Sequence, residues 1–338
     1  MHELSVSFKS DSQKKVEQRY VMTVIGIAFM YLYLYLFQSL LADRLLGGQP
    51  MEWGRVREYN SLKYSLRALE KNIPWVRNVF IISKEGLVPD WIDPTHPKIT
   101  ILKDEDIWPE RYKGKFKVTF NSNNVDINLG RIPGISECFV YFNDDMFVDR
   151  PTKKSDFCDR NNIPQIYTTA RLAAVSGKSN NIWHRCIQHT ANQIRSLFSH
   201  AKGVYHVAHG PYAMSTRAFD YIYQHLDSEI ERTMSAFTRQ PTDLQTPLLQ
   251  GWVAHEVLQA PAIRAPKTFL YYHEVQCNDI RLETIKTTIL NRRPQFQFVC
   301  LNDKLNDKEK DMQHWYKQID AMYTALYPQR SSFELVKK

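Results

Sequence analysis

Two adjacent carboxylates, Asp144 and Asp145, directly follow the hydrophobic segment CFVY at residues 138–141. An ionised carboxylate is costly to bury without a partner. At the end of a buried strand the pair would therefore coordinate a divalent cation, bind a sugar hydroxyl or pair with arginine. Mg²⁺ is commonly held by one or two carboxylates together with substrate phosphates, which favours a cation site. The alternative is a structural turn in which Asn143 and Asp144 cap the strand.

His209, in the segment VAHGPYA, is a second residue that could do chemistry. The ordinary pKa of histidine lies close to neutrality, so its imidazole can take a proton from a hydroxyl group. The alternative is a core or loop histidine that bonds to the backbone. His206, in the same segment, is less suited because no Gly-Pro follows it.

Further polar residues could bind a phosphorylated ligand. The guanidinium of Arg239 can grip two phosphate oxygens at once, although it could instead be a surface arginine paired with Asp243. Asn302 and Asp303 follow the apolar run FQFVCL and could complete a metal or pyrophosphate site. They could equally form a turn, since Asn-Asp is common in turns.

The composition is that of a globular protein with an anionic partner. The chain has 338 residues and a formal net charge of +8, which favours nucleotides, phosphosugars or acidic lipid. Its basic residues are scattered and not interleaved with aromatic residues, so we predict no nucleic-acid partner. The five cysteines form no CxxC pair and indicate neither a zinc site nor a disulfide framework.

The segments that must position these residues alternate between helix and strand. Leu62, Leu66 and Leu69 have helical spacing after Asn60, a plausible cap, and Pro74 ends that helix. The segments VRNVFIIS, KITILKD and CFVYFNDD then read as buried strands. This alternation predicts an α/β fold with a Rossmann-like, mostly parallel sheet and flanking helices. In such a sheet ligands bind beyond the carboxyl ends of the strands, where Asp144 and Asp145 fall.

The N-terminal region contains a long apolar stretch. Residues 20–42 carry no charge and lie between Arg19 and Asp43, a length sufficient to cross a membrane as one helix. We therefore predict a tail at 1–19 and a transmembrane anchor at 20–42. The alternative is a buried helix or a pair of strands, because tyrosine and β-branched residues are frequent there.

Several long motifs resemble those of the Stealth family of sugar-1-phosphate transferases. They are YNSLKYSLRALEKNIPW, ITILKDEDIWP, FVYFNDDMFVDRP, HVAHGPYAM and FVCLNDKLNDKEKD, and the resemblance covers about Asn60 to Leu335. It implies that residues 43–338 transfer a hexose-1-phosphate, expected to be N-acetylglucosamine-1-phosphate, from a UDP-sugar to a hydroxyl of an acceptor glycan. UMP would be released, and Mg²⁺ or Mn²⁺ would serve as cofactor.

The resemblance also implies roles for individual residues. His209 would be the general base, Arg239 the phosphate clamp, and Asp145 a catalytic group that binds metal with Asp144 and Asp303. Substrate-binding roles fall to Arg67, Asn121, Ser122, Asp126, Asn143, Lys178, Asp243 and Asn302. Arg67 could instead hold its helix in place. Gly130 stands where relatives commonly carry histidine.

The first block of the family, a strand at the nucleotide site, has no match in this sequence. This leaves open a catalytically inactive relative that binds a glycan or a partner, or an incomplete gene model. A conventional metal-dependent glycosyltransferase is a third alternative, because two aspartates at a strand end also suit a UDP-sugar. The anchor and the closing motifs CLND and SSFEL favour a single-pass type II protein of the Golgi over one of the bacterial inner membrane. Homo-oligomerisation is left open.

Overall fold

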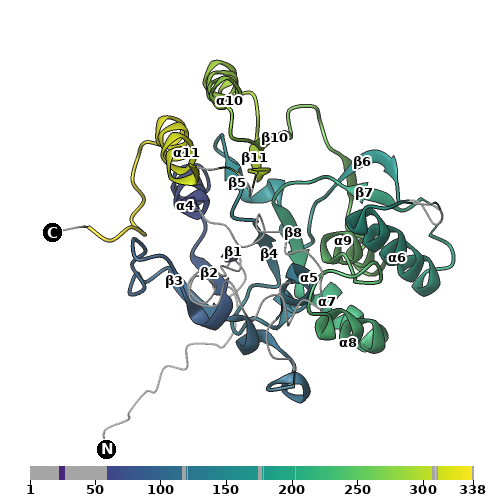
Figure 1. Ribbon diagram of the computed structural model, residues 1–338. Helices are drawn as coiled ribbons and strands as arrows, with labels where there is room; N and C mark the ends of the chain where they lie inside the picture. The colour runs from purple at the N-terminus through teal and green to yellow at the C-terminus, as the bar shows by residue number, and fades with distance from the viewer. Residues whose placement is uncertain are drawn as a thin grey trace, which may run out of the picture.

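The computed structural model describes residues 23–26, 59–115, 119, 121–173, 177, 179–201, 203–306, 309 and 311–336. Within them an α/β fold is built from three sheets, with helices packed around and between them (Figure 1). Short 3-10 turns connect several elements: η2 (Lys84–Gly86), η3 (Asp104–Ile107), η4 (Glu110–Tyr112), η5 (Leu129–Arg131) and η6 (Lys154–Asp156).

The largest sheet has the strand order β3-β2-β1-β4-β8. Its strands are β1 (Thr23–Gly26), β2 (Asn78–Ser83), β3 (Ile99–Lys103), β4 (Cys138–Tyr141) and β8 (Tyr212–Ser215). The first four are parallel, and β8 is antiparallel to β4 at one edge. β2 and β4 are nearly continuous runs of buried apolar residues, as is typical of parallel sheets covered on both faces. The predicted α/β class and mostly parallel sheet are confirmed.

Strand β1 corrects the interpretation of the N-terminal region. Thr23–Gly26 pairs in parallel with β2 on one side and β4 on the other, near the centre of the sheet. A continuous helix over residues 20–42 is therefore wrong at these four residues, and the rest of the predicted anchor and tail lies outside the described residues. No helix in the described part of the chain is long and apolar enough to span a membrane.

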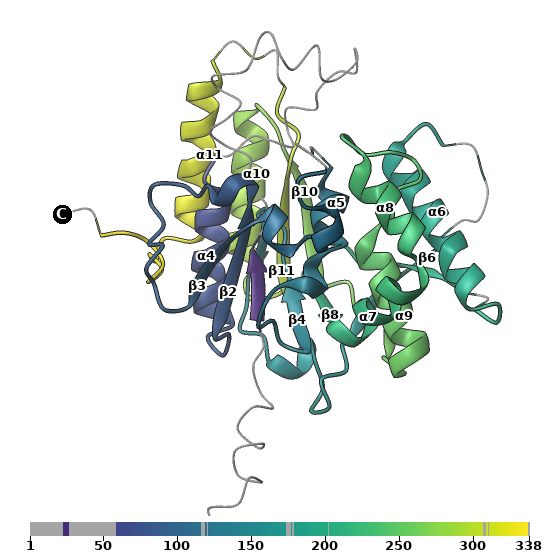
Figure 2. The ribbon, with the colours of Figure 1, turned by 90° about the horizontal axis from the view of Figure 1, so that it is seen from below.

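A second sheet has the order β10-β11-β5. β10 (Leu270–Val275) is parallel to β11 (Phe298–Asp303), and β5 (Met146–Val148) is antiparallel to β11. Figure 2 shows α4 (Ser61–Asn72), α10 (Asp279–Arg292) and α11 (Met312–Leu326) on this side of the molecule. The turn between β4 and β5 joins the first sheet to the second, and this turn carries Asp144 and Asp145.

The third sheet has the order β7-β6-β9. β6 (Ile166–Leu172) is antiparallel to β7 (Tyr205–Val207) and parallel to β9 (Ala262–Arg264). The helices on this side are α5 (Ser122–Asp126), α6 (Ile182–Leu197), α7 (Thr216–His225), α8 (Asp227–Ser235) and α9 (Thr246–Leu258). α9 packs tightly on the sheet at Gly251, where an added Cβ would lie 3.3 Å from the side chains of Ile166 and Val207.

One disulfide differs from the sequence-based expectation. Cys138 at the start of β4 is bonded to Cys158, which lies just after η6, whereas Cys186 and Cys300 carry thiols. Both bonded residues are buried in the core cluster that surrounds β4 and β5. The spacing of the cysteines could not reveal this pair, because the two come together only when residues 142–157 fold back on β4.

Candidate active site

Asp144 and Asp145 occupy the turn after β4, where three distant parts of the chain meet. The Ser61 hydroxyl, at the start of α4, donates to Oδ2 of Asp144 at 3.1 Å. From β11, the amide of Leu301 donates to the Asp145 carbonyl at 3.0 Å, and the Asn302 side-chain amide lies 3.4 Å from Oδ2 of Asp145. The turn is closed by Met146, whose amide donates to the Asn143 carbonyl at 3.0 Å. The carboxylates therefore have fixed positions at the carboxyl edge of β4.

The charges of this pair are not compensated within the described residues. Burial raises the pKa of Asp145 to about 7, with a further contribution from the neighbouring Asp144. Burial likewise raises the pKa of Asp144. Oδ1 of Asp145 is buried and accepts no hydrogen bond, and no described lysine or arginine lies within ion-pair distance of either residue. Two half-buried carboxylates without a counter-charge have the donor chemistry that a hard divalent cation requires.

The remaining ligands of such a cation would have to come largely from the substrate. The described residues contain no group of three or more His, Cys, Asp or Glu side chains arranged to hold a metal ion. Burial is the main cause of the raised pKa of Tyr59, and Asp303 lies near enough for its charge to add to this shift together with those of Asp145 and Asp144. Its Oδ1, however, accepts a hydrogen bond from the Leu305 amide at 2.8 Å, as in a turn. Of the three predicted metal ligands, Asp144 and Asp145 are adjacent, whereas Asp303 lies near them but is bonded within its own turn.

His209 lies on the other side of the same cluster. Its Nδ1 is 3.1 Å from the Tyr212 hydroxyl, and the ring of Tyr272 approaches edge-on with 5.8 Å between centroids. Burial lowers the pKa of His209 to about 4, so the imidazole is neutral at neutral pH and has one nitrogen free of a proton. The following Gly210 lets this loop pass close to Phe269, because an added Cβ would lie 2.9 Å from that ring.

Cys300 connects the carboxylates to the histidine, and sequence reasoning missed it. Its Sγ lies 3.5 Å from Oδ2 of Asp145 and 3.5 Å from Nε2 of His209. Burial and the negative charge of Asp145 raise its thiol pKa well above the usual value, so the sulfur keeps its proton. Only its position in the sequence could have indicated Cys300 as a site residue. It precedes the predicted site residue Asn302 by two residues, so the two side chains lie on the same face of the strand.

A second polar cluster contains Asp126 and Arg239. The Tyr141 hydroxyl donates to Oδ1 of Asp126 at 2.7 Å, and Arg239 Nη2 donates to the Ser122 hydroxyl at 2.8 Å. Burial raises the pKa of Asp126 to about 6, while the Tyr141 hydrogen bond and the charge of Arg239 act in the opposite direction. The ring of Tyr141 stacks on Tyr212, the hydrogen-bond partner of His209, with 6.2 Å between centroids. The two clusters are therefore neighbours.

Asn121 and Asp243 lie beneath this second cluster. Asn121 Nδ2 donates to Oδ2 of Asp243 at 2.7 Å, and the Gln240 amide donates to the same oxygen at 2.7 Å. Asn121 is 1% exposed and Asp243 is 0% exposed. These contacts hold Asn121 and Asp243 in place beside Ser122 and Arg239. They support a role in positioning Ser122 and Arg239, and not the predicted direct contact with substrate.

Arg67 and Lys178 stand apart from the other predicted residues. Arg67 forms a two-bond ion pair with Glu334 at 2.7 and 2.8 Å and also donates to the Tyr327 carbonyl at 3.1 Å. These contacts support the alternative that Arg67 holds α4 against the C-terminal segment. Lys178 lies outside the described residues. At Gly130, an added Cβ would lie 2.5 Å from the side chain of Phe219, so a histidine would not fit without a shift of that ring.

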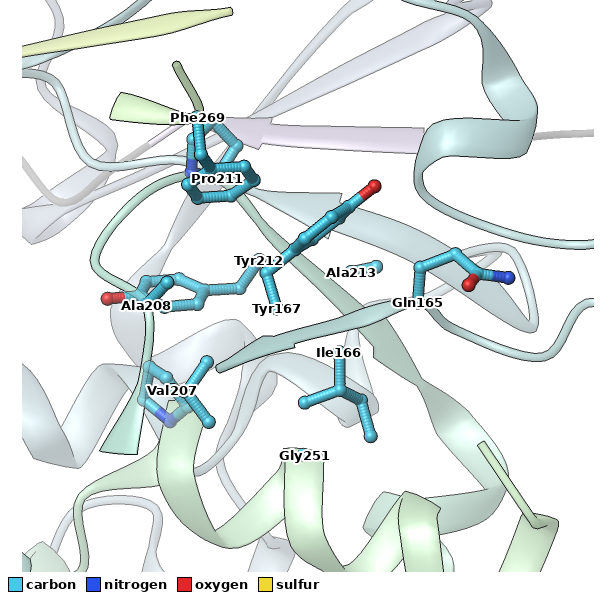
Figure 3. A pocket seen from close by; sticks show the side chains of 11 residues that line it. Gln165, Ile166, Tyr167, Val207, Ala208, Pro211, Tyr212, Ala213, Gly251 and Phe269 are labelled. Carbon is cyan, nitrogen blue, oxygen red and sulfur yellow. The ribbon is translucent and has the colours of Figure 1, made fainter. Parts of the chain in front are cut away.

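A small cavity lies next to His209 but contains none of the predicted site residues. It encloses about 280 Å³ of space, part of it open to solvent, between β6, β8 and α9. Figure 3 shows Tyr212 and Tyr167 with Pro211 and Phe269 on one side of β6, and Val207 and Gly251 on the other. The cavity adjoins the loop that carries His209. One of its lining residues is Tyr212, whose hydroxyl lies within hydrogen-bond distance of His209.

The fold and the site define an α/β protein with two half-buried carboxylates and a neutral histidine at the carboxyl edge of a mostly parallel sheet. Two family models match the sequence. Residues 55–166 match Stealth protein conserved region 2, and residues 288–338 match Stealth protein conserved region 4. The chain thus contains two conserved regions of the Stealth family.

Several bacterial proteins are similar to this chain. An exopolysaccharide phosphotransferase of Streptomyces coelicolor is 29% identical over 295 residues, which cover 85% of this chain and 48% of that protein. The capsular polysaccharide phosphotransferase WcwK of Streptococcus pneumoniae is 44% identical over 111 residues, or 33% of this chain and 31% of that protein. The receptor polysaccharide phosphotransferase WefC of Streptococcus oralis is 26% identical and covers 82% of this chain and 87% of its own. The chain thus spans about half, or less, of the first two relatives.

Among solved structures, the galactosyltransferase LgtC in complex with donor and acceptor sugar analogues aligns with a TM-score of 0.44. The alignment has 11% sequence identity and covers 92% of this chain and 98% of that one.

Proposed function

We propose that the protein transfers a hexose-1-phosphate from a UDP-sugar to a hydroxyl of a polysaccharide acceptor and releases UMP, with N-acetylglucosamine-1-phosphate as the expected group. The observation that carries this proposal is the contact of Cys300 with both Asp145 and His209. It brings a group that can accept a proton next to groups suited to a metal–phosphate complex. The two conserved regions of the Stealth family and the phosphotransferase names of the relatives support the same reaction.

Each group has a task in this reaction. Neutral His209 takes the proton of the acceptor hydroxyl as the oxygen attacks the phosphorus that carries the sugar. An oxygen–phosphorus bond forms, the bond from that phosphorus to the bridging oxygen of the diphosphate breaks, and UMP leaves with the bridging oxygen. Arg239, which is bonded to Ser122, presents a guanidinium that suits phosphate oxygens.

The carboxylates Asp144 and Asp145 would hold Mg²⁺ or Mn²⁺. When bound, such an ion neutralises phosphate charge. The unbonded Oδ1 of Asp145 and the raised pKa values of both residues support this assignment, because the pair lacks a positive partner among the described residues.

Strand β1 favours an active protein over a binding relative. Thr23–Gly26 fills the position between β2 and β4 in the sheet, which supports an intact sheet behind the carboxylates. Attachment to a Golgi or bacterial inner membrane stays a prediction, and so does homo-oligomerisation.

The nucleotide product tests the proposal. We would incubate the full chain with a panel of UDP-hexoses, Mn²⁺ and an oligosaccharide acceptor, and separate the nucleotides by ion exchange. UMP together with a new phosphodiester in the ³¹P NMR spectrum of the glycan is expected. UDP would instead indicate a conventional glycosyltransferase, and the absence of any nucleotide product from a folded sample would indicate a binding relative.

A further inference from the structure

A second cluster of aromatic and basic side chains lies where α6 begins, outside the site described above. Trp183 is 38% exposed, and its ring lies 5.3 Å from that of His184 and 6.2 Å from that of His206, between centroids. Arg171 joins them from β6. The antiparallel β6–β7 ladder pairs Thr168 with Val207 and Leu172 with Tyr205, so Arg171 lies in the irregular part of β6 between these pairs, opposite the position of His206.

The basic groups of this cluster have no acidic partner in the described part of the chain. His206 is 8% exposed and makes no hydrogen bond to another described residue, and neither Arg171 nor His184 forms an ion pair there. Burial, and then the charges of Arg171 and His184, lower the pKa of His206. A buried, unpartnered imidazole beside an unpaired guanidinium is the environment that an anion would stabilise.

Helix α6 adds to this positive potential. It is 16 residues long, and its N-terminal turn carries both Trp183 and His184. The first amide groups of a helix lack partners within the helix and carry partial positive charge, so they favour anions. Asn181 caps this end through its Oδ1, which accepts from the His184 amide at 3.1 Å.

The cluster is connected directly to the predicted base. β7, which contains His206, continues through Ala208 into His209. Three residues of extended chain span about 10 Å. An oligosaccharide whose terminal sugar lies at His209 could therefore place a neighbouring sugar at Trp183 and Arg171.

We propose that Arg171, Trp183 and His206 form a subsite for a phosphodiester-containing stretch of the acceptor glycan. The exposed face of Trp183 suits a sugar ring, and the basic groups suit the charge of a phosphodiester. The inference rests on the proposed function, because each turnover leaves a phosphodiester on the acceptor and so makes the growing product anionic. The subsite would favour glycan that has already been modified.

Binding to the full-length protein tests the subsite without catalysis. Isothermal titration would compare a synthetic oligosaccharide containing hexose-1-phosphate diesters with the same oligosaccharide without phosphate. We expect the phosphorylated form to bind at least about tenfold more tightly, with an advantage that shrinks as salt rises. Arg171→Gln should remove most of that advantage. Trp183→Ala removes the surface for a sugar ring and should weaken the binding of both forms, and Trp183→Phe should weaken it less.

Controls separate loss of the subsite from loss of the fold. Arg160→Gln removes another exposed arginine, in the turn that precedes β6, and should leave binding unchanged. Melting temperatures and UMP release with a short unphosphorylated acceptor should stay at wild-type values in the Arg171 and Trp183 variants.

The outcomes also distinguish this inference from the proposed function. Equal binding of the two oligosaccharides, an undiminished preference in folded Arg171→Gln, or unchanged binding by folded Trp183→Ala would overturn the subsite even if UMP is released. Equally tight binding of an oligodeoxynucleotide of the same charge would overturn its assignment to glycan. A phosphate preference that Arg171→Gln abolishes would support the subsite even if the wild-type protein releases no UMP.

Discussion

Cys300 lies 3.5 Å from the imidazole of His209, and the same sulfur contacts the Asp145 carboxylate. The thiol belongs to β11, the histidine to the loop between β7 and β8, and the aspartate to the turn after β4. One buried S–H group thus sits between the predicted base and the predicted metal ligand. Because its pKa is raised well above the ordinary value, it acts as a protonated bridge and not as a nucleophile.

Removal of this bridge should impair turnover more than folding. A hydrogen bond to a buried polar group contributes roughly 1 kcal/mol, so Cys300→Ala should lower kcat for UMP release about fivefold. Cys300→Ser restores an O–H donor and should recover part of the loss. Steady-state rates and melting curves of both variants provide the check. Equal rates for Ala, Ser and wild type would show that the bridge has no functional role.

Divalent cations should stabilise the protein through Asp144 and Asp145. A ligand at a hundred times its Kd raises the free energy of unfolding by about 2.7 kcal/mol. Mn²⁺ should therefore raise the melting temperature of wild type at pH 7.5, and EDTA should reverse the shift. The Asp144→Asn/Asp145→Asn double variant should show no shift, whereas Asp90→Asn, at an exposed aspartate, should behave as wild type. A full shift in the double variant would place the ion elsewhere.

Asp126 should make stability depend on pH. Burial raises its pKa to about 6 in the folded protein, above the ordinary 3.8, so the folded state holds this proton more tightly than the unfolded state. Its contribution to stability is therefore greatest below pH 4 and is lost as pH rises to about 6. Asp126→Asn removes this loss. The free energy of unfolding of the variant minus that of wild type should therefore be roughly 2 to 3 kcal/mol larger at pH 7 than at pH 4. Urea unfolding at the two pH values measures the change, and a pH-independent difference would refute the assignment.

Arg67 should prove structural. Its guanidinium is bonded to the nearly buried Glu334, and loss of one partner from such a pair leaves the other charge uncompensated. Arg67→Met should reduce the free energy of unfolding by about 3 kcal/mol and leave the KM for the UDP-sugar unchanged in the folded fraction. Glu334→Gln serves as the matched variant and should be milder, since Arg67 keeps its bond to the Tyr327 carbonyl. A raised KM with unchanged stability would instead favour the predicted substrate contact.

Local patterns predicted the elements that lie close together in sequence. The leucine spacing located α4, and the apolar runs located β2, β3 and β4. Asn60 does precede α4, but it adopts a left-handed conformation with φ 69° and its side chain donates to Asp320 and does not cap the helix. Even here a tertiary contact decided what the side chain does.

Features that depend on long-range pairing escaped the sequence. The apolar stretch at 20–42 has a composition that suits a membrane helix, and only its partners β2 and β4 identify Thr23–Gly26 as a strand. Likewise, Cys300 gains its neighbours because β11 pairs with β5, which follows the aspartate turn. Asp144, Asp145 and His209 could be chosen by residue type and motif, but the sulfur that connects them could not.

The most direct test of the central claim is the initial rate of UMP release by His209→Gln. The assay would use the full chain with Mn²⁺, a UDP-hexose and an oligosaccharide acceptor, with His225→Gln as a control at an exposed histidine on α7. Loss of a general base typically costs about a hundredfold or more in rate. We expect a fall of that size in His209→Gln and none in His225→Gln. An unchanged rate in a folded His209→Gln variant would contradict the assignment of His209 as the base.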